Sequence, residues 1–246
     1  MNVISPSRGG YEFPFIGSRI ETPTSMTFRF STKGSGFRFR SNQAVRLHLP
    51  GVQDPWGPAR LFSLSSSPTE SDEIAVTVKM TGSPFKEGLR NLQPGDRAQF
   101  FGPLGDLIYD PALPAVMIAG GIGITPFRGM IRYALDTGAT EPIVLIYSAR
   151  TPEELAFRTE LDRMAARHKA VTIHYTITRP DETKITWEGR VGRVDEQLIR
   201  DASAGLANPN YYFAGLPEMI DSTMEILRSR WGLPEERLWW EPFRGY

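Results

Sequence analysis

The chain has 246 residues, of which 40% are hydrophobic and 23% charged, and its 28 basic residues balance its 28 acidic ones. The balance gives no overall field that would attract nucleic acid or a membrane surface, and the composition is that of an ordinary globular protein. The absence of cysteine excludes disulfides, thiolate-held zinc or iron–sulfur clusters and a cysteine nucleophile. With only three histidines as well, we predict no metal site.

The amino-terminal MNVISPSRGGYEF lacks the apolar core of a secretory signal, and no uncharged apolar run reaches membrane-spanning length. We therefore expect a cytoplasmic protein without membrane insertion. The charge is uneven, because residues 1–60 hold eight basic residues against three acidic ones, a surplus of five. This segment is either a solvated strand surface or a docking face for an acidic partner.

Short alternating segments fill residues 11–110, among them MTFRFST, AVRLHLP and EIAVTVKM, and turn residues separate them. This rhythm predicts an antiparallel sandwich or small barrel. After residue 113 the pattern changes to apolar runs such as PAVMIAG, PIVLIYSAR and NYYFAG, which alternate with longer segments of helical period. That alternation predicts a parallel sheet with crossover helices. We place the boundary at residues 109–114 and expect domains 1–112 and 113–246.

Two helix starts are predicted in the second half. Thr125 can cap a helix in which Pro126 takes the first position, where its missing N–H is not needed. Thr151 is likewise followed by proline, and Glu154 completes a capping box.

The stretch MIAGGIGITPF, residues 117–127, breaks an apolar run into glycines before the first of these helices. Gly121 and Gly123 would lie at the carboxyl end of a buried strand, where open parallel sheets bind ligands. Without side chains they allow a phosphate or a flat ring to approach the backbone. The alternative is a tight strand–helix turn that needs glycine for its backbone angles.

The stretch ARLFSLSSSP, residues 59–68, gathers one cation and several hydroxyls around an aromatic ring. Arg60, Ser63 and Ser65–Ser67 surround Phe62 in the sequence, a combination that suits a phosphate and a conjugated ring with polar edges. The alternative is a polar loop that follows a strand.

In this order, the segments resemble the ferredoxin–NADP⁺ reductase superfamily from about residue 13 onward. RLFSL is similar to its flavin motif, VKMTGSPFKEGLRNLQPGD to its pyrophosphate-binding segment, and GPLGDL with AGGIGITPF to its domain junction and nicotinamide loop. YFAGLP and WWEPFRGY are similar to its last strand end and its aromatic carboxyl terminus. The resemblance implies two domains: an antiparallel Greek-key β-barrel that binds FAD, then a Rossmann-like α/β domain that binds NADP(H) and ends in a tail stacked on the flavin.

The resemblance also implies roles for single residues. Arg60 would pair with the FAD pyrophosphate, Phe62 would stack on the ring in place of the family's usual tyrosine, and Ser63 would sit beside flavin N5. Glu241 and Phe243 would complete the catalytic set with Ser63, and Tyr246 competes with Phe243 to cover the flavin. The whole flavin site would comprise Arg60, Phe62, Ser63, Leu64, Lys79, Gly82, Ser83, Lys86, Phe243 and Tyr246.

The nicotinamide half of the coenzyme would be received by Gly121, Gly123, Thr125, Pro126, Gly215 and Pro217. Ala214 stands where many relatives have a cysteine. The adenosine end would meet Ser148, Arg150, Thr178 and Arg179. Paired arginines can hold a 2′-phosphate, and no acid directly ends the IVLIYSAR strand. We therefore expect NADP(H), with NAD(H) as the alternative.

The resemblance implies hydride transfer between NADP(H) and FAD, and single-electron transfer between the flavin and a separate carrier. An acidic ferredoxin or flavodoxin is the expected carrier, docked on the basic amino-terminal third, and no nucleic-acid partner is expected. One alternative is a reductase of ferric chelates, of free flavin or of an oxygenase partner. Two others are a non-catalytic flavin-binding electron-transfer subunit and a flavin-free binding protein.

Overall fold

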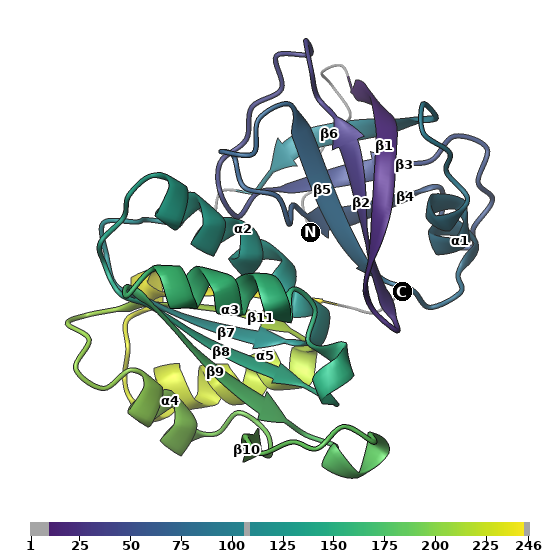
Figure 1. The fold of residues 1–246 in the computed structure, drawn as a ribbon. Coiled ribbons are helices and arrows are strands. Elements are labelled where there is room, and N and C mark those ends of the chain that lie inside the picture. The colour runs from purple at the N-terminus through teal and green to yellow at the C-terminus, as the bar shows by residue number, and fades with distance from the viewer. Residues whose placement is uncertain (1–9, 106–108, 244–246) are drawn as a thin grey trace.

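The computed structural model describes residues 10–105 and 109–243, which form two six-stranded sheets in succession along the chain (Figure 1). The first sheet is antiparallel and has the order β4-β3-β6-β1-β2-β5. Its strands are β1 (Tyr11–Thr22), β2 (Ser25–Ser31), β3 (Ala44–His48), β4 (Ala59–Ser63), β5 (Glu73–Lys79) and β6 (Arg97–Leu104), and helix α1 (Pro84–Arg90) follows β5.

The antiparallel sheet curls into a barrel, since an isolated bridge joins Leu64, just after β4, to Val76 in the middle of β5, the strand at the opposite edge of the sheet. Alternation along the strands turns every second side chain inward, and the barrel core is rich in phenylalanine. Phe30 and Phe100, for example, meet edge to face with ring centroids 4.8 Å apart. The barrel predicted from the alternating segments is confirmed.

The second sheet is parallel throughout, in the order β10-β9-β8-β7-β11-β12. Its strands are β7 (Ala115–Gly120), β8 (Ile143–Ala149), β9 (Val171–Ile177), β10 (Arg190–Val191), β11 (Asn210–Gly215) and β12 (Leu238–Pro242). Because β7, β8 and β11 are interior strands buried on both faces, they are almost continuously apolar. The predicted parallel α/β domain is also confirmed.

Helices cover both faces of the parallel sheet (Figure 1). On one face pack α2 (Ile124–Asp136) and α3 (Arg158–Arg167), and on the other pack α4 (Glu196–Ala202) and α5 (Pro217–Met224), which continues as the π-helix η4 (Glu225–Arg230). Four short 3₁₀ turns complete this half: η1 (Gly121–Gly123), η2 (Pro152–Glu154), η3 (Pro180–Glu182) and η5 (Glu235–Arg237). In the described ranges, no helix combines the length and apolar character needed to cross a membrane.

Both predicted caps are wrong. Helix α2 begins at Ile124, one residue before Thr125, because the 3₁₀ turn of Gly121–Gly123 runs directly into it and Gly123 takes the cap position. Thr151 precedes only the short turn η2, and its side chain caps nothing there. Helix α3 starts later, after Phe157 in a left-handed conformation.

The segment that joins the sheets also packs with the second one. Tyr109 is 2% exposed, and its ring meets that of Tyr212 on β11 edge to face, with centroids 5.9 Å apart. The division into domains 1–112 and 113–246 stays a prediction.

Candidate functional site

The two sheets meet at a hydrogen bond between Ser63, the last residue of β4, and Glu241 on the edge strand β12. Ser63 Oγ donates to Glu241 Oε1 at 2.7 Å across 178 residues of sequence. Ser63 is 6% exposed, and burial raises the pKa of Glu241 while the hydrogen bond from Ser63 opposes that rise. The structure thus brings together two of the three residues expected to be catalytic.

Phe243, the third, follows β12, and its backbone N–H donates to the carbonyl of Gly215 at 2.7 Å. Pro217 begins α5 two residues after Gly215, so the end of β11 and the end of β12 are joined at this point. Tyr246 lies outside the described residues.

Arg60 is buried on β4, and both terminal nitrogens of its guanidinium have partners. Nη2 pairs with Asp54 Oδ1 at 2.5 Å, and Nη1 donates to three backbone carbonyls at 2.8–3.0 Å. The guanidinium also lies over the ring of Phe85, 5.1 Å from its centroid. Sequence reasoning missed Asp54, which nothing in its local pattern marks. A pyrophosphate bound by Arg60 would have to replace these partners, and that role stays a prediction.

Asp54 is held as an anion by its surroundings. Burial acts to raise its pKa, but the backbone N–H groups of Trp56 and Phe85 and the guanidinium of Arg60 together lower it below the ordinary value. The carboxylate therefore neutralises one of the cations expected at the flavin.

Two lysines add positive charge beside Arg60. Burial lowers the pKa of Lys86, and the positive charges of Arg60 and Lys79 lower it further. Lys86 Nζ donates to Thr81 Oγ1 at 3.0 Å, and Lys79 Nζ lies 3.9 Å from a Glu154 carboxylate oxygen on η2. Crowded cations of this kind favour an anion among them, so the chemistry of this donor set fits the diphosphate of FAD.

The remaining residues predicted for the flavin have local structural partners. Gly82 has the left-handed φ of +75°, and the Ser83 hydroxyl caps α1 by accepting from the Lys86 N–H. Phe62 stacks on Phe85 with centroids 6.0 Å apart. Leu64 is buried in the barrel core.

The hydroxyls of Ser65–Ser67, which the sequence groups with Arg60 and Ser63, have partners within the barrel. Ser65 Oγ bonds to the hydroxyl of Thr77 at 2.8 Å, and Ser66 Oγ accepts from the Ala75 N–H at 3.0 Å. Ser67 Oγ bonds to the hydroxyl of Thr69 at 2.6 Å. These side chains satisfy backbone and hydroxyl groups of the barrel, because a buried polar group without a partner is costly.

The glycine loop after β7 lies against the end of β11. A Cβ on Gly123 would be 2.2 Å from the carbonyl oxygen of Ala214, so only glycine fits there. Gly121 has a φ of +53° and open space around it. Such bare backbone allows a flat ring to come close, which fits a nicotinamide. Thr125 and Pro126 are buried in the first turn of α2.

Met219 on α5 is a residue that sequence reasoning missed. Its Sδ would lie 2.4 Å from a Cβ on Gly120 and 3.1 Å from one on Gly215. The thioether therefore fills the space that these two glycines leave, next to the loop predicted to receive the nicotinamide. Methionine at helical spacing is an ordinary core pattern, and the sequence carries no signal for this contact.

The residues predicted for the adenosine end lie at the carboxyl ends of β8 and β9. Ser148 is on β8, opposite Gly120 in register, and Thr178 Oγ1 donates to the Ala149 carbonyl at 3.3 Å. Arg150 and Arg179 follow the two strands. The sequence shows no acid directly after IVLIYSAR. In the fold, however, Glu182 on η3 lies beside the end of this strand and pairs with both Arg150 and Arg179.

A polar network joins α2 to the barrel. Arg128 pairs with both Glu70 carboxylate oxygens, at 2.9 Å for the Nη2 contact, and with Glu160 on α3 at 2.5 Å. It also donates to the Ser65 carbonyl at 3.1 Å. This network fixes the parallel sheet against the barrel beside the Ser63–Glu241 bond. No motif in the sequence predicts the network.

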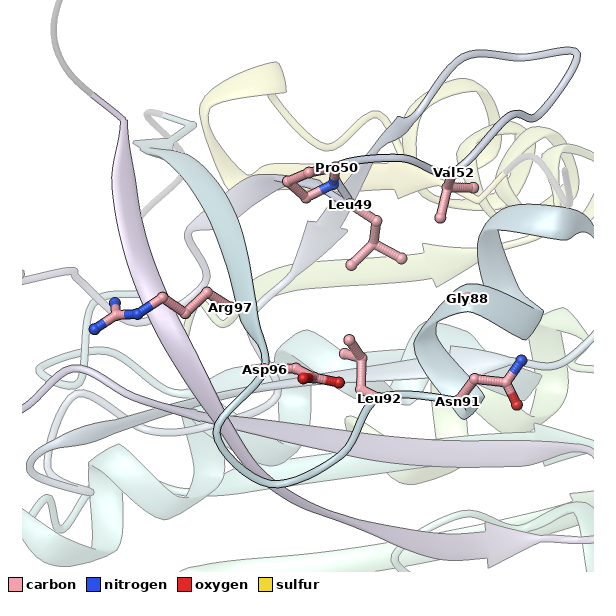
Figure 2. Close-up of a pocket in the computed structure, with 8 residues that line it drawn as sticks. All are labelled: Leu49, Pro50, Val52, Gly88, Asn91, Leu92, Asp96 and Arg97. Carbon is pink, nitrogen blue, oxygen red and sulfur yellow. The ribbon is translucent and has the colours of Figure 1, made fainter.

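A separate hollow of about 200 Å³ opens between the loop after β3 and the last turn of α1 (Figure 2). Leu49, Val52 and Leu92 give it apolar walls. Asp96 already accepts a hydrogen bond from the Gln93 N–H at 2.7 Å, and the Arg97 side chain points away from the leucines (Figure 2). The hollow therefore lacks the convergent free polar groups expected of a catalytic site.

Comparison with known proteins places these features among flavin-dependent reductases. Residues 117–225 match the family model of the oxidoreductase NAD-binding domain. The chain is 31% identical to ferredoxin–NADP reductase B of Sorangium cellulosum, over 83% of this chain and 85% of that protein. It is 32% identical to the stachydrine N-demethylase reductase subunit of Rhizobium meliloti, over 73% of this chain but 51% of that subunit.

Among solved structures, the ferredoxin NADP⁺ reductase of Neisseria gonorrhoeae with bound FAD and NADP superposes with a TM-score of 0.78. It shares 21% sequence identity, and the match covers 96% of this chain and 99% of that one. The likeness shows the shared fold: a barrel followed by a parallel sheet.

Proposed function

The chain belongs to the ferredoxin–NADP⁺ reductase superfamily, and from this premise we propose that it passes electrons singly to a separate acidic carrier, a ferredoxin or a flavodoxin. Membership makes it a flavoenzyme that binds FAD and NAD(P) and transfers electrons from NAD(P)H through the flavin to a partner. The identity of the partner and the roles of individual residues belong to the proposal, as does a cytoplasmic location.

The observation that carries the proposal is the 2.7 Å hydrogen bond from Ser63 to Glu241. It sets a hydroxyl from the barrel and a partly buried carboxylate from the parallel sheet at one point, within reach of the glycine loop on the neighbouring strands. Bound FAD supplies the chemistry that converts a two-electron hydride into single electrons. Ser63 would hold a hydrogen-bonding hydroxyl at the reacting edge of the ring, and Glu241 would orient that hydroxyl.

The other residues would hold the two cofactors in place. Lys79, Lys86 and Arg60 would hold the diphosphate, while Phe62 and Phe243 would lie against the ring system. Gly121 and Gly123 would admit the nicotinamide, and burial between the two sheets would exclude water from the reacting atoms.

An exposed basic segment supports an acidic carrier. Of the eight basic residues in the first sixty, Arg19, Arg29 and Arg60 pair with carboxylates, and Arg8 lies outside the described residues. Four others are exposed and form no ion pair with any described residue: Lys33, Arg38, Arg40 and Arg46.

We call these four residues the basic segment. Leu61, which is 58% exposed, pairs across the sheet with Arg46 and adds an apolar contact. Interfaces between electron-transfer proteins typically bury little area, and charge steers their association. The exposed charges of the basic segment, with Leu61 beside them, suit such an interface.

The salt dependence of carrier reduction tests this proposal. With an acidic ferredoxin as acceptor, the second-order rate should fall about tenfold as NaCl rises from about 50 to about 500 mM, because salt screens exposed charges. Replacing Arg38, Arg40 and Arg46 together by Gln should lower the rate at low salt by a similar factor and flatten its salt dependence.

The matched control replaces Arg163 and Arg167 on α3 and Lys169 just after it, all of which are exposed, by Gln. It removes the same charge from the other half of the molecule and should leave most of the rate. A rate in the unmodified protein that does not change with salt would refute charge-steered docking.

A second candidate partner is an oxygenase component, favoured by the 33% identity, over 78% of this chain, to the glycine betaine monooxygenase reductase subunit of Pseudomonas aeruginosa. The chain spans about half the length of that relative. Turnover with ferredoxin, flavodoxin, ferric chelate, free flavin and an oxygenase component, compared at equal concentration, separates the candidates.

A further inference from the structure

A carboxylate occupies the space between the two arginines at the carboxyl edge of the parallel sheet. Glu182 Oε2 lies 2.8 Å from Arg150 Nη2, and Glu182 Oε1 lies 2.7 Å from Arg179 Nη1. Each oxygen of one carboxylate is therefore taken by a different guanidinium. The backbone supports this arrangement, since the Arg179 N–H donates to the Arg150 carbonyl at 2.8 Å and the Glu182 N–H to the Arg179 carbonyl at 3.1 Å.

These three residues lie at the edge of the sheet where the adenosine end of the coenzyme would bind. Strands β8 and β9 are parallel neighbours, and β8 lies next to β7, which carries the glycine loop. A dinucleotide with its nicotinamide at that loop extends along the carboxyl edge of such a sheet, with its adenosine toward β8 and β9. The two arginines then stand where the adenosine 2′ position would come.

The chemistry of the triad makes the carboxylate a rival for a phosphate. A 2′-phosphate would bind the two guanidinium groups through charge-assisted hydrogen bonds, the same bonds that Glu182 now accepts. Hydrogen bonding to Arg179 lowers the pKa of Glu182, with Arg150 adding to the effect, so the competing group is an anion near neutral pH. All three side chains are about half exposed, so water screens the pairs and a ligand can displace the carboxylate.

We propose that Glu182 is a specificity-determining residue that competes with the 2′-phosphate of NADP(H) for Arg150 and Arg179. This competition lowers the affinity for NADP(H) relative to NAD(H), compared with the ratio that the two arginines alone would give. The proposal rests on the proposed nicotinamide-nucleotide site and deepens it. NAD(H), which has a free 2′-hydroxyl, does not need the two guanidinium groups and is not affected by the competition.

The test measures binding of two adenosine fragments to the FAD-loaded protein by calorimetry. Adenosine 2′,5′-bisphosphate carries the 2′-phosphate, and adenosine 5′-monophosphate carries the hydroxyl. Glu182→Gln should tighten binding of the bisphosphate about five- to tenfold, the range set by freeing an exposed ion-pair partner. Binding of the monophosphate should stay within about twofold, because it does not use these arginines.

Asp181→Asn is the matched control. Asp181 lies next to Glu182 on η3 and forms no ion pair with a described residue, so this change removes the same charge without freeing either arginine. It should leave the ratio of the two affinities unchanged. In the double variant Arg179→Ala/Glu182→Gln, most of the gain should disappear.

The possible failures are distinct. If Glu182→Gln leaves bisphosphate binding unchanged or weakens it, Glu182 does not compete, and the inference is overturned while the nucleotide site stands. An equal gain in Asp181→Asn would overturn it too, since the effect would then be one of bulk charge. If neither fragment binds the FAD-loaded unmodified protein, the proposed nucleotide site fails, and the inference fails with it.

Discussion

Replacing Ser63 by alanine is expected to slow reduction of the bound flavin by NAD(P)H about a hundredfold, a loss typical of misplacing a reacting pair. The hydroxyl donates at 2.7 Å to Glu241, the partly buried carboxylate that comes from the other sheet. Alanine removes the hydroxyl that Glu241 orients. Flavin content should not change, because the cationic donors Lys79 and Lys86 and the ring of Phe62 are untouched.

Anaerobic stopped-flow absorbance of the flavin measures this rate. Ser65→Ala is the matched control, since Ser65 lies two residues further along, is 1% exposed, and its hydroxyl bonds to Thr77 and the Ala75 carbonyl within the barrel. In Ser65→Ala, NAD(P)H should reduce the bound flavin at close to the rate of the unmodified protein. Ser63→Thr keeps a hydroxyl and should restore most of the activity. If the flavin of Ser63→Ala is reduced as fast as that of the unmodified protein, Ser63 has no part in hydride transfer.

Replacing Gly123 by alanine should destabilise the protein by about 3 kcal/mol and abolish binding of the nicotinamide nucleotide. The added Cβ would lie 2.2 Å from the carbonyl oxygen of Ala214, 2.5 Å from its carbon and 2.9 Å from the nitrogen of Gly215. These atoms are backbone of β11, which is fixed between β7 and β12. Relief of the overlap therefore requires the glycine loop to move away from the strand.

Urea unfolding measures the change in the free energy of unfolding, and Gly88→Ala provides the comparison. At Gly88 the nearest atom to an added Cβ is the Val52 Cγ2 at 2.8 Å, the end of a side chain that can rotate. Alanine also favours the interior of helix α1 by about 1 kcal/mol, so the net change should lie within about 1 kcal/mol of zero. A Gly123→Ala variant as stable as the unmodified protein would contradict the close contact.

The architecture could be predicted because its signals are local. Alternation of side chains in MTFRFST and EIAVTVKM reports one buried face, and continuous apolar runs such as PIVLIYSAR report strands buried on both faces. Helix starts were less predictable. The Thr-Pro pairs at Thr125 and Thr151 are sound capping signals, but the adjoining 3₁₀ turns changed where each helix begins.

The missed contacts at the site join residues that no motif in the sequence pairs, whether they lie 6 or 32 residues apart. Asp54 reaches Arg60 through a loop of irregular structure, and Glu182 reaches Arg150 from 32 residues further along the chain. Both are acids that meet an arginine singled out from the sequence. The sequence singles out these arginines, but only the folded chain shows that neighbouring carboxylates pair with them.

The most direct test of the account is to load the purified chain with FAD, remove the excess, and mix it anaerobically with NADPH or NADH. We predict that the chain retains the flavin and that at least one coenzyme bleaches its absorbance as the ring is reduced. A chain that keeps no flavin when FAD is supplied in excess would contradict the account, as would bound flavin whose colour survives both coenzymes.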